Sequence, residues 1–194
     1  MQFFHRYLHK VKGLVSHAKR LLWTHPLLRI QGMQIGRGAK VGSPVCSWPH
    51  KVSIASKCII ENNVTFNHVG IWSPGYSIKL KHGVFVGTGA EFNIRCGVTV
   101  GDHSLIAAGC RLIDHDHGIQ AGFLIGPQQG QEAEIIIGSD VWIGADSIVL
   151  KGVHVGDGAV IGAGSVVTGN IPKDEIWAGV PARKIGVRSA YHLF

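Results

Sequence analysis

The sequence predicts an all-β protein in which short parallel strands coil into a solenoid, with an amphipathic helix before the coils and a short segment after them. Three observations favour this fold. Aliphatic residues recur at every sixth position over long stretches. Glycine makes up 27 of the 194 residues, about twice the usual share, which argues against a helical bundle. Charged residues are few, at 16% against about 25% in an average protein.

The six-residue period is unbroken over residues 137–172, which divide into IGSDVW, IGADSI, VLKGVH, VGDGAV, IGAGSV and VTGNIP. The same register occurs earlier, at Ile35, Val41, Ile54, Ile60, Val100, Ile106 and Leu112. On a helix, this period would spread apolar residues around every face. Three strand-and-bend hexapeptides instead close a triangular coil of about 18 residues whose every sixth aliphatic side chain points inward. We therefore expect one solenoid domain over residues 30–172, with roughly seven coils.

The register breaks between Glu61 and Val86, and again between Leu112 and Ile137. Insertions into a solenoid emerge as surface loops, and such loops commonly carry function. The second insertion, around residues 113–136, contains DHDHGIQAGFLIGPQQGQ. We expect the chemistry of the protein to be concentrated there.

The N-terminal segment, residues 1–29, has apolar residues at helical spacing, interspersed with lysines and arginines. Residues 1–60 hold ten Lys or Arg and no acid, whereas the remaining residues hold nine Lys or Arg and twelve acids. The net charge of +7 is thus local, and we do not expect a nucleic-acid partner. The helix either caps the open end of the solenoid or lies on an anionic membrane surface.

The composition also bounds the location of the protein. No window approaches the roughly 18 apolar residues of a membrane-spanning helix, and no signal-peptide pattern precedes the first lysines. The four cysteines are widely spaced, without a zinc-finger pattern. These features favour the cytoplasm, at the inner face of the membrane if the N-terminal helix binds lipid.

The hexapeptides, together with FN at 92–93, TVGDHSLIAAGCRLIDHDHG at 99–118, the VWIG segment and AGVPARKI at 178–185, resemble the left-handed β-helix acyltransferases. Within that family the likeness is to the maltose, galactoside and polysaccharide O-acetyltransferases, and it covers about residues 30–187. The resemblance implies a homotrimer that binds acetyl-CoA between neighbouring prisms, with no metal. It also implies direct acetyl transfer to a carbohydrate hydroxyl, with His117 as the general base and His115 as its rival.

The chemistry of the residues agrees with this expectation. A sugar hydroxyl is a poor nucleophile, and a neutral imidazole with a pKa near about 6.5 can accept its proton, a contribution of roughly 10²–10⁴-fold. We group Asp114 and Asp116 with the acceptor side, where they would orient or balance the charge of an imidazole. In an extended segment both would point away from the histidines, and the alternative interpretation is that they are turn residues.

The resemblance also implies further binding residues. On the acceptor side, Asn93 would hydrogen-bond the sugar and Trp142 would flank it, or else Trp142 packs at a corner of the prism. The residues expected to bind CoA are Gly144, Ala145 and Ala163 at the pantetheine arm, and Thr168, Arg183 and Lys184 at the nucleotide end. The segment 173–194 would close that end of the site. A lysine usual in the family is replaced by Gly169.

Two other classes of function remain as alternatives. One is a metal enzyme like the γ-class carbonic anhydrases, since His115 and His117 share one face of an extended strand, although no two histidines in the chain are five apart. The other is a non-catalytic β-helix module that has kept the coils and lost the chemistry.

Overall fold

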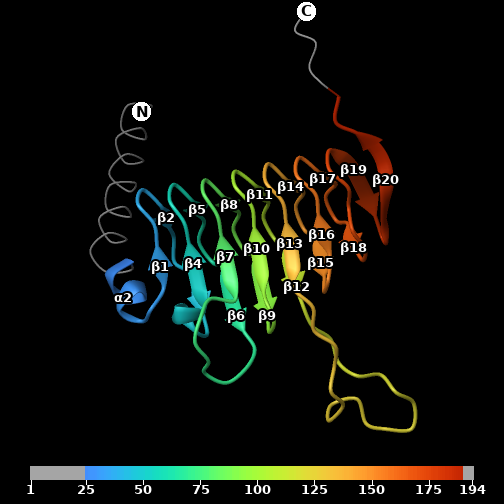
Figure 1. The fold of residues 1–194 in the computed structure, drawn as a ribbon, viewed down its shortest axis with the longest axis horizontal. Coiled ribbons are helices and arrows are strands. Elements are labelled where there is room, and N and C mark those ends of the chain that lie inside the picture. Colours follow the sequence, from blue (N-terminus) through green and yellow to red (C-terminus); the bar gives the residue numbers. More distant parts are fainter. Residues whose placement is uncertain (1–24, 190–194) are drawn as a thin grey trace, which may run out of the picture.

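A computed structural model describes residues 25–189, and these residues form three sheets, parallel except for one antiparallel pair at the C-terminal end, that wrap around one core (Figure 1). Sheet A contains β1 (Gln34–Ile35), β4 (Val52–Ile54), β7 (Ile78–Leu80), β10 (Val98–Val100), β13 (Ile135–Ile137) and β16 (His154–Val155). Sheet B contains β2 (Lys40–Val41), β5 (Ile59–Ile60), β8 (Phe85–Val86), β11 (Leu105–Ile106), β14 (Trp142–Ile143) and β17 (Val160–Ile161), followed by β19 (Glu175–Gly179) and β20 (Ala182–Val187). Sheet C contains β3 (Val45–Cys46), β6 (Thr65–His68), β9 (Glu91–Ile94), β12 (Arg111–Ile113), β15 (Ile148–Leu150) and β18 (Val166–Val167).

Each turn of the solenoid takes one strand from each sheet, so β1 to β18 make six coils, not the seven expected from length. The difference lies in the insertions. Residues 69–77 and 114–134 leave the sheets between β6 and β7 and between β12 and β13, and so add no strand. The first break in the register is also narrower than the sequence suggested, because β6 and β7 keep their parallel partners on both sides of it.

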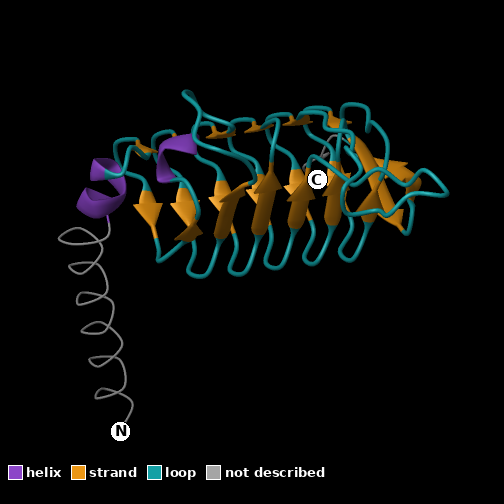
Figure 2. Ribbon diagram, turned by 90° about the horizontal axis from the view of Figure 1, so that it is seen from below, coloured by secondary structure: helices purple, strands orange, loops and turns teal. Residues whose placement is uncertain are grey.

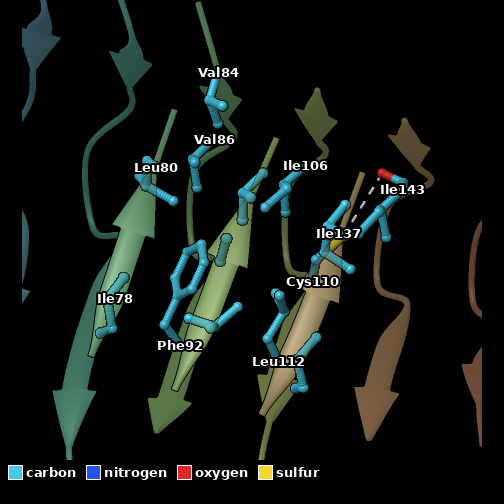
Figure 3. Packing of buried hydrophobic residues seen from close by; sticks show 14 of the residues in the cluster. Ile78, Leu80, Val84, Val86, Phe92, Ile106, Cys110, Leu112, Ile137 and Ile143 are labelled. Atoms are coloured by element: carbon cyan, nitrogen blue, oxygen red, sulfur yellow. Dashed lines mark hydrogen bonds between the residues drawn. The ribbon is translucent and has the colours of Figure 1, made fainter. Parts of the chain in front are cut away.

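The core confirms the predicted meaning of the six-residue period. The aliphatic residues at the first position of the six C-terminal hexapeptides are at most 2% exposed: Ile137, Ile143, Val149, Val155, Ile161 and Val167. Equivalent residues stack from coil to coil (Figure 3), and wider side chains fill the middle, where the Phe66 and Phe92 rings lie 5.2 Å apart. Burial of each large side chain contributes about 1.5–3 kcal/mol.

Both ends of the solenoid in the described region carry other elements. At the N-terminal end lies the helix α2 (His25–Ile30) (Figure 2). It buries Leu28, and the His25 ring nitrogen Nε2 lies 3.1 Å from the Val41 carbonyl oxygen. A 3-10 helix, η2 (Pro49–Lys51), follows in the first coil. At the other end, β19 and β20 form an antiparallel hairpin that extends sheet B. The predicted amphipathic helix over residues 1–29 lies outside the described residues except for its last five.

Candidate active site

Two edges of the prism carry the residues that the sequence singled out. The loop edge is where strands of sheet C lead into sheet A, and it comprises residues 69–77, 95–97 and 114–134 (Figure 1). The alanine edge is where strands of sheet B lead into sheet C, and it comprises residues 144–147 and 162–165. The candidate base lies on the first edge and the candidate CoA contacts lie mainly on the second.

The loop edge is organised by a buried carboxylate. Asp114 is fully buried, and its Oδ1 accepts the Arg95 N–H at 2.8 Å. Its Oδ2 accepts the N–H groups of Cys96 and Gly97, both at 2.7 Å. Because three main-chain donors of the preceding corner converge on it, Asp114 ties the base of the inserted loop to that corner. This arrangement contradicts the expected acceptor contact, since its oxygens face the protein interior.

His115 is held by the same carboxylate. Its Nδ1 lies 3.0 Å from Asp114 Oδ1, and its side chain is 14% exposed. The alternation of an extended strand predicted that the two side chains would point apart, but the chain leaves sheet C after Ile113, and that rule no longer applies. The contact with Asp114 holds the His115 ring in place at the base of the inserted loop.

His117 is exposed, and it follows a residue whose main chain is bonded across the loop, because the Asp116 N–H donates to the Gln131 carbonyl at 3.1 Å. The preceding residue, Asp116, bonds to the Gln131 N–H across the loop at 2.9 Å and forms an ion pair with Lys151, which lowers the pKa of the Asp116 carboxyl. A Cβ on Gly130 would lie 1.7 Å from the Asp116 carbonyl oxygen and 3.0 Å from the Cα of His117. The two arms of the loop thus pack closely and present the imidazole outward. Asp116 has protein partners here in place of the expected contact with an acceptor or a ring.

Asn93 lies beside this segment. It pairs with Ile113 of β12 near the end of its own strand, and its Oδ1 accepts a hydrogen bond from Asn67 Nδ2 at 3.0 Å. The structure therefore brings Asn93, His115 and His117 to one edge. Trp142 does not join them, because it lies on the outer side of sheet B, between Leu105 and Val160 on the neighbouring strands.

The small residues expected at the pantetheine arm line the alanine edge. Ala145 and Ala163 follow β14 and β17 in successive coils, and the Gly164 N–H donates to the Ala145 carbonyl at 2.8 Å. A Cβ on Gly144 would lie 2.5 Å from the Ala163 nitrogen, so only glycine fits there. This edge therefore offers a low surface along which an extended ligand can lie.

The residues expected at the nucleotide end are not gathered in one place. Arg183 is exposed on β20, with Nη1 bonded to the Ala182 carbonyl. Lys184 is paired with Glu175, and this ammonium lowers the pKa of the Glu175 carboxyl. Thr168 follows β18 and so lies at the loop-edge end of sheet C. Of the three, Arg183 best keeps donors available for phosphate.

Sheet C separates the two edges within one chain. β15 lies between Ser147 at the alanine edge and Lys151 at the loop edge, and the four steps from Ser147 to Lys151 span about 13 Å at 3.3 Å per residue. The candidate base and the candidate CoA contacts of one protomer are therefore not adjacent. Either the donor reaches across sheet C, or a second copy supplies one of the edges.

Two properties of the described residues bear on the other predictions. Between residues 25 and 189, no group of three or more His, Cys, Asp or Glu is close enough to hold a metal ion. No helix in that part of the chain is long and apolar enough to cross a membrane.

Sequence reasoning missed three features of this site. The anchoring role of Asp114 depends on main-chain donors that have no side-chain signature. The pairing of Lys151 with Asp116 joins residues 35 apart. The close approach at Gly130 depends on how the two arms of the loop pack. Gly130 itself can be read from the sequence, but the sequence does not show that it packs against Asp116 and His117.

Comparison with known proteins agrees with these features. Residues 134–169 match the bacterial transferase hexapeptide (six repeats) family, and residues 82–112 match the hexapeptide repeat of succinyl-transferase. WbbJ of Escherichia coli K12, named for O-acetyl transfer in lipopolysaccharide biosynthesis, is 31% identical over 146 residues, covering 66% of this chain and 74% of WbbJ. Galactoside O-acetyltransferase of the same strain is 41% identical over 88 residues, or 45% of this chain and 43% of that protein.

Solved structures share the fold. A single-site mutant of AntD, an N-acyltransferase from Bacillus cereus, in complex with dTDP and coenzyme A, superposes with a TM-score of 0.75 at 21% identity, covering 84% of this chain and 88% of AntD. A maltose O-acetyltransferase from Clostridium difficile 630 gives 0.57 at 22% identity, covering 95% and 86%. The solenoid is a left-handed parallel β-helix, as predicted.

The chain belongs to the hexapeptide-repeat acyltransferase family. It is accordingly an enzyme that transfers an acyl group, and the non-catalytic and metal-enzyme alternatives are not favoured.

Proposed function

We propose that this protein is an acetyl-CoA-dependent O-acetyltransferase that acetylates a hydroxyl group of a carbohydrate, in the assembly of a surface polysaccharide. The observation that carries the proposal is the rigid segment at residues 114–117, which presents an exposed imidazole beside Asn93 in a chain of this family. The names of WbbJ and the galactoside enzyme support the choice of oxygen and of a sugar.

In this proposal His117 is the base and His115 belongs to its support. A neutral His117 ring accepts the proton of the acceptor hydroxyl as that oxygen attacks the thioester carbonyl. The new C–O bond forms, the C–S bond breaks, and the imidazolium returns the proton to the departing CoA sulfur. The reaction needs no covalent acyl-enzyme, and Asn93 would hydrogen-bond the acceptor.

The alanine edge would hold the donor. Ala145 and Ala163, with Gly144 between the coils, leave room for a pantetheine arm, and Arg183 offers a fork of donors to phosphate. Lys184 would contribute only by sharing its charge with Glu175. Thr168 lies across sheet C from these residues and so would touch a donor bound by a neighbouring copy.

A homotrimer would complete the site, with the loop edge of one protomer facing the alanine edge of the next. Two observations support it. The outer row of sheet B is apolar from Ile59 through Leu105 to Trp142, and such a row is usually covered. The tip of the 114–134 loop extends away from its own coils (Figure 1) and exposes Phe123 and Leu124. In this arrangement Trp142 of the neighbouring protomer would flank the acceptor.

We place the reaction in the cytoplasm, with the basic segment 1–29 holding the enzyme near lipid-linked glycans at the inner face of the membrane. The excess of ten Lys or Arg over no acid in residues 1–60 supports attraction to an anionic surface.

The experiment that tests the proposal is an acceptor screen with acetyl-CoA, read by release of the CoA thiol. We expect turnover with at least one sugar. His117→Ala should lower kcat by about 10²-fold or more, with nearly unchanged CoA affinity in calorimetry. If His115→Ala shows that behaviour while His117→Ala stays fully active, the roles of the two rings are reversed.

A further inference from the structure

The first inserted loop, residues 69–77, exposes large apolar side chains that the proposed chemistry does not use. Trp72 is 64% exposed, and Ile71 and Tyr76 beside it are also exposed. The remaining residues of the loop are small or uncharged. An indole so exposed on a nine-residue insertion is free to contact a ligand in this chain.

The loop is built on the preceding coil. Lys51 is only 5% exposed, and its ammonium donates to Ser73 Oγ at 2.6 Å and to the Pro74 carbonyl at 3.3 Å. His50 Nε2 donates to the Ser73 carbonyl at 3.2 Å, and the His50 ring lies 5.8 Å from the Trp72 ring at an angle of 31°. The indole is therefore backed by a second ring and held on an anchored turn, which lowers the entropy lost when it binds a ligand.

The loop also lies on the same edge as the candidate base. The Val69 N–H donates to the Ile94 carbonyl at 2.7 Å, and the next corner along that edge is the one that Asp114 holds. The two insertions thus start two coils apart, about 10 Å at the usual strand spacing, and both project from this edge (Figure 1). The bond from Asn67 to Asn93 joins the coil that carries the loop to the proposed acceptor contact.

We propose that Trp72 forms a second carbohydrate subsite, which binds the sugar unit next to the one that is acetylated. A pyranose has a face of C–H groups that can pack against an indole. It also has a rim of hydroxyl groups that can form hydrogen bonds with polar groups of the surrounding loop. The inference rests on the proposed function and gives it a substrate class, an oligosaccharide rather than a monosaccharide. Alone, the three apolar side chains are too few to provide the roughly 800 Å² per partner of a stable protein interface, and in the proposed trimer this loop borders the shared site, where a glycan acceptor would lie.

The test compares methyl glycosides with the corresponding disaccharides of glucose, galactose, mannose, N-acetylglucosamine and rhamnose. Binding to the full chain is measured by saturation-transfer NMR, without acetyl-CoA. We expect at least one disaccharide to bind about tenfold more tightly than its methyl glycoside. Trp72→Ala should abolish that gain, Trp72→Phe should retain most of it, and both variants should keep the wild-type melting temperature.

Three outcomes would overturn the proposal: no disaccharide binds better than its methyl glycoside, the gain survives in Trp72→Ala, or Trp72→Ala instead releases the protein from phosphatidylglycerol vesicles. The proposed function fails separately. It fails if no glycan gives thiol release with acetyl-CoA, whatever the NMR binding shows.

Discussion

The buried carboxylate of Asp114 is the structural feature on which the loop edge depends, and Asp114→Asn removes half of it. Asparagine keeps one oxygen, and the favoured orientation of its amide places that oxygen at the Oδ2 position, where it still accepts the N–H groups of Cys96 and Gly97, now both 2.7 Å from the carboxylate. Its NH₂ group then faces the Arg95 N–H, which donates to Oδ1 at 2.8 Å in the native chain. One hydrogen bond is lost, and one main-chain donor faces another donor.

The size of the effect follows from that one donor. A buried donor that loses its acceptor costs about 1–3 kcal/mol, so the free energy of unfolding should fall by about 2 kcal/mol. For a chain of this length 1 kcal/mol corresponds to about 2–4 °C, and the melting temperature should drop by about 6 °C. Chemical denaturation followed by circular dichroism measures the first quantity, and a thermal scan measures the second.

Asp116→Asn is the matched control, two residues away. Asp116 pairs with Lys151 at the surface and is 47% exposed, so its loss should cost under about 1 kcal/mol. If Asp114→Asn destabilises the protein no more than Asp116→Asn does, then Asp114 is not the anchor of the loop.

Three further predictions concern other parts of the chain. Gly130→Ala places a methyl group against the opposite arm of the loop, so kcat should fall at least about tenfold with little change in melting temperature; unchanged kcat would refute the packing argument. Burial lowers the pKa of His68 below its ordinary 6.5, so the native state favours the neutral ring and stability should fall as the pH drops below about 6.5; melting temperatures at pH 7.5 and 5 should differ less in His68→Asn, and an equal difference would contradict this. Arg183→Ala should weaken CoA binding in calorimetry more than Lys184→Ala does, because Lys184 is already paired; the reverse order would exclude Arg183 as the main phosphate contact.

The fold was largely predictable because aliphatic residues recur at every sixth position of the sequence. A side chain such as Ile143 points inward for the same geometric reason in every coil, so one register predicts the whole core. The number of coils was not predictable, because the residues at 69–77 and 114–134 could be assigned to strands or loops only once the flanking partners were known.

The site was predictable only in its residue types. The sequence indicated that the DHDH segment carries the chemistry, but Asp114 turned inward because main-chain donors of another coil meet there, and no pattern in the side chains reports them. Trp142 was expected to flank the acceptor or to pack at a corner of the prism, and in one chain it lies on the outer side of sheet B, away from the edge that carries His117.

Because the loop edge and the alanine edge lie apart in one chain, the central claim is that neighbouring protomers share each active site. Subunit mixing tests this claim most directly. His117→Ala and Ala163→Trp, each inactive alone, are co-expressed with different tags in equal amounts and the mixed oligomers are purified. If each site takes its base from one protomer and its donor edge from the next around a trimeric ring, one of the three sites in every mixed trimer combines two intact halves, and thiol release should return to about one third of wild-type activity. Mixed oligomers as inactive as either parent would show that base and donor edge belong to the same chain and would contradict the account.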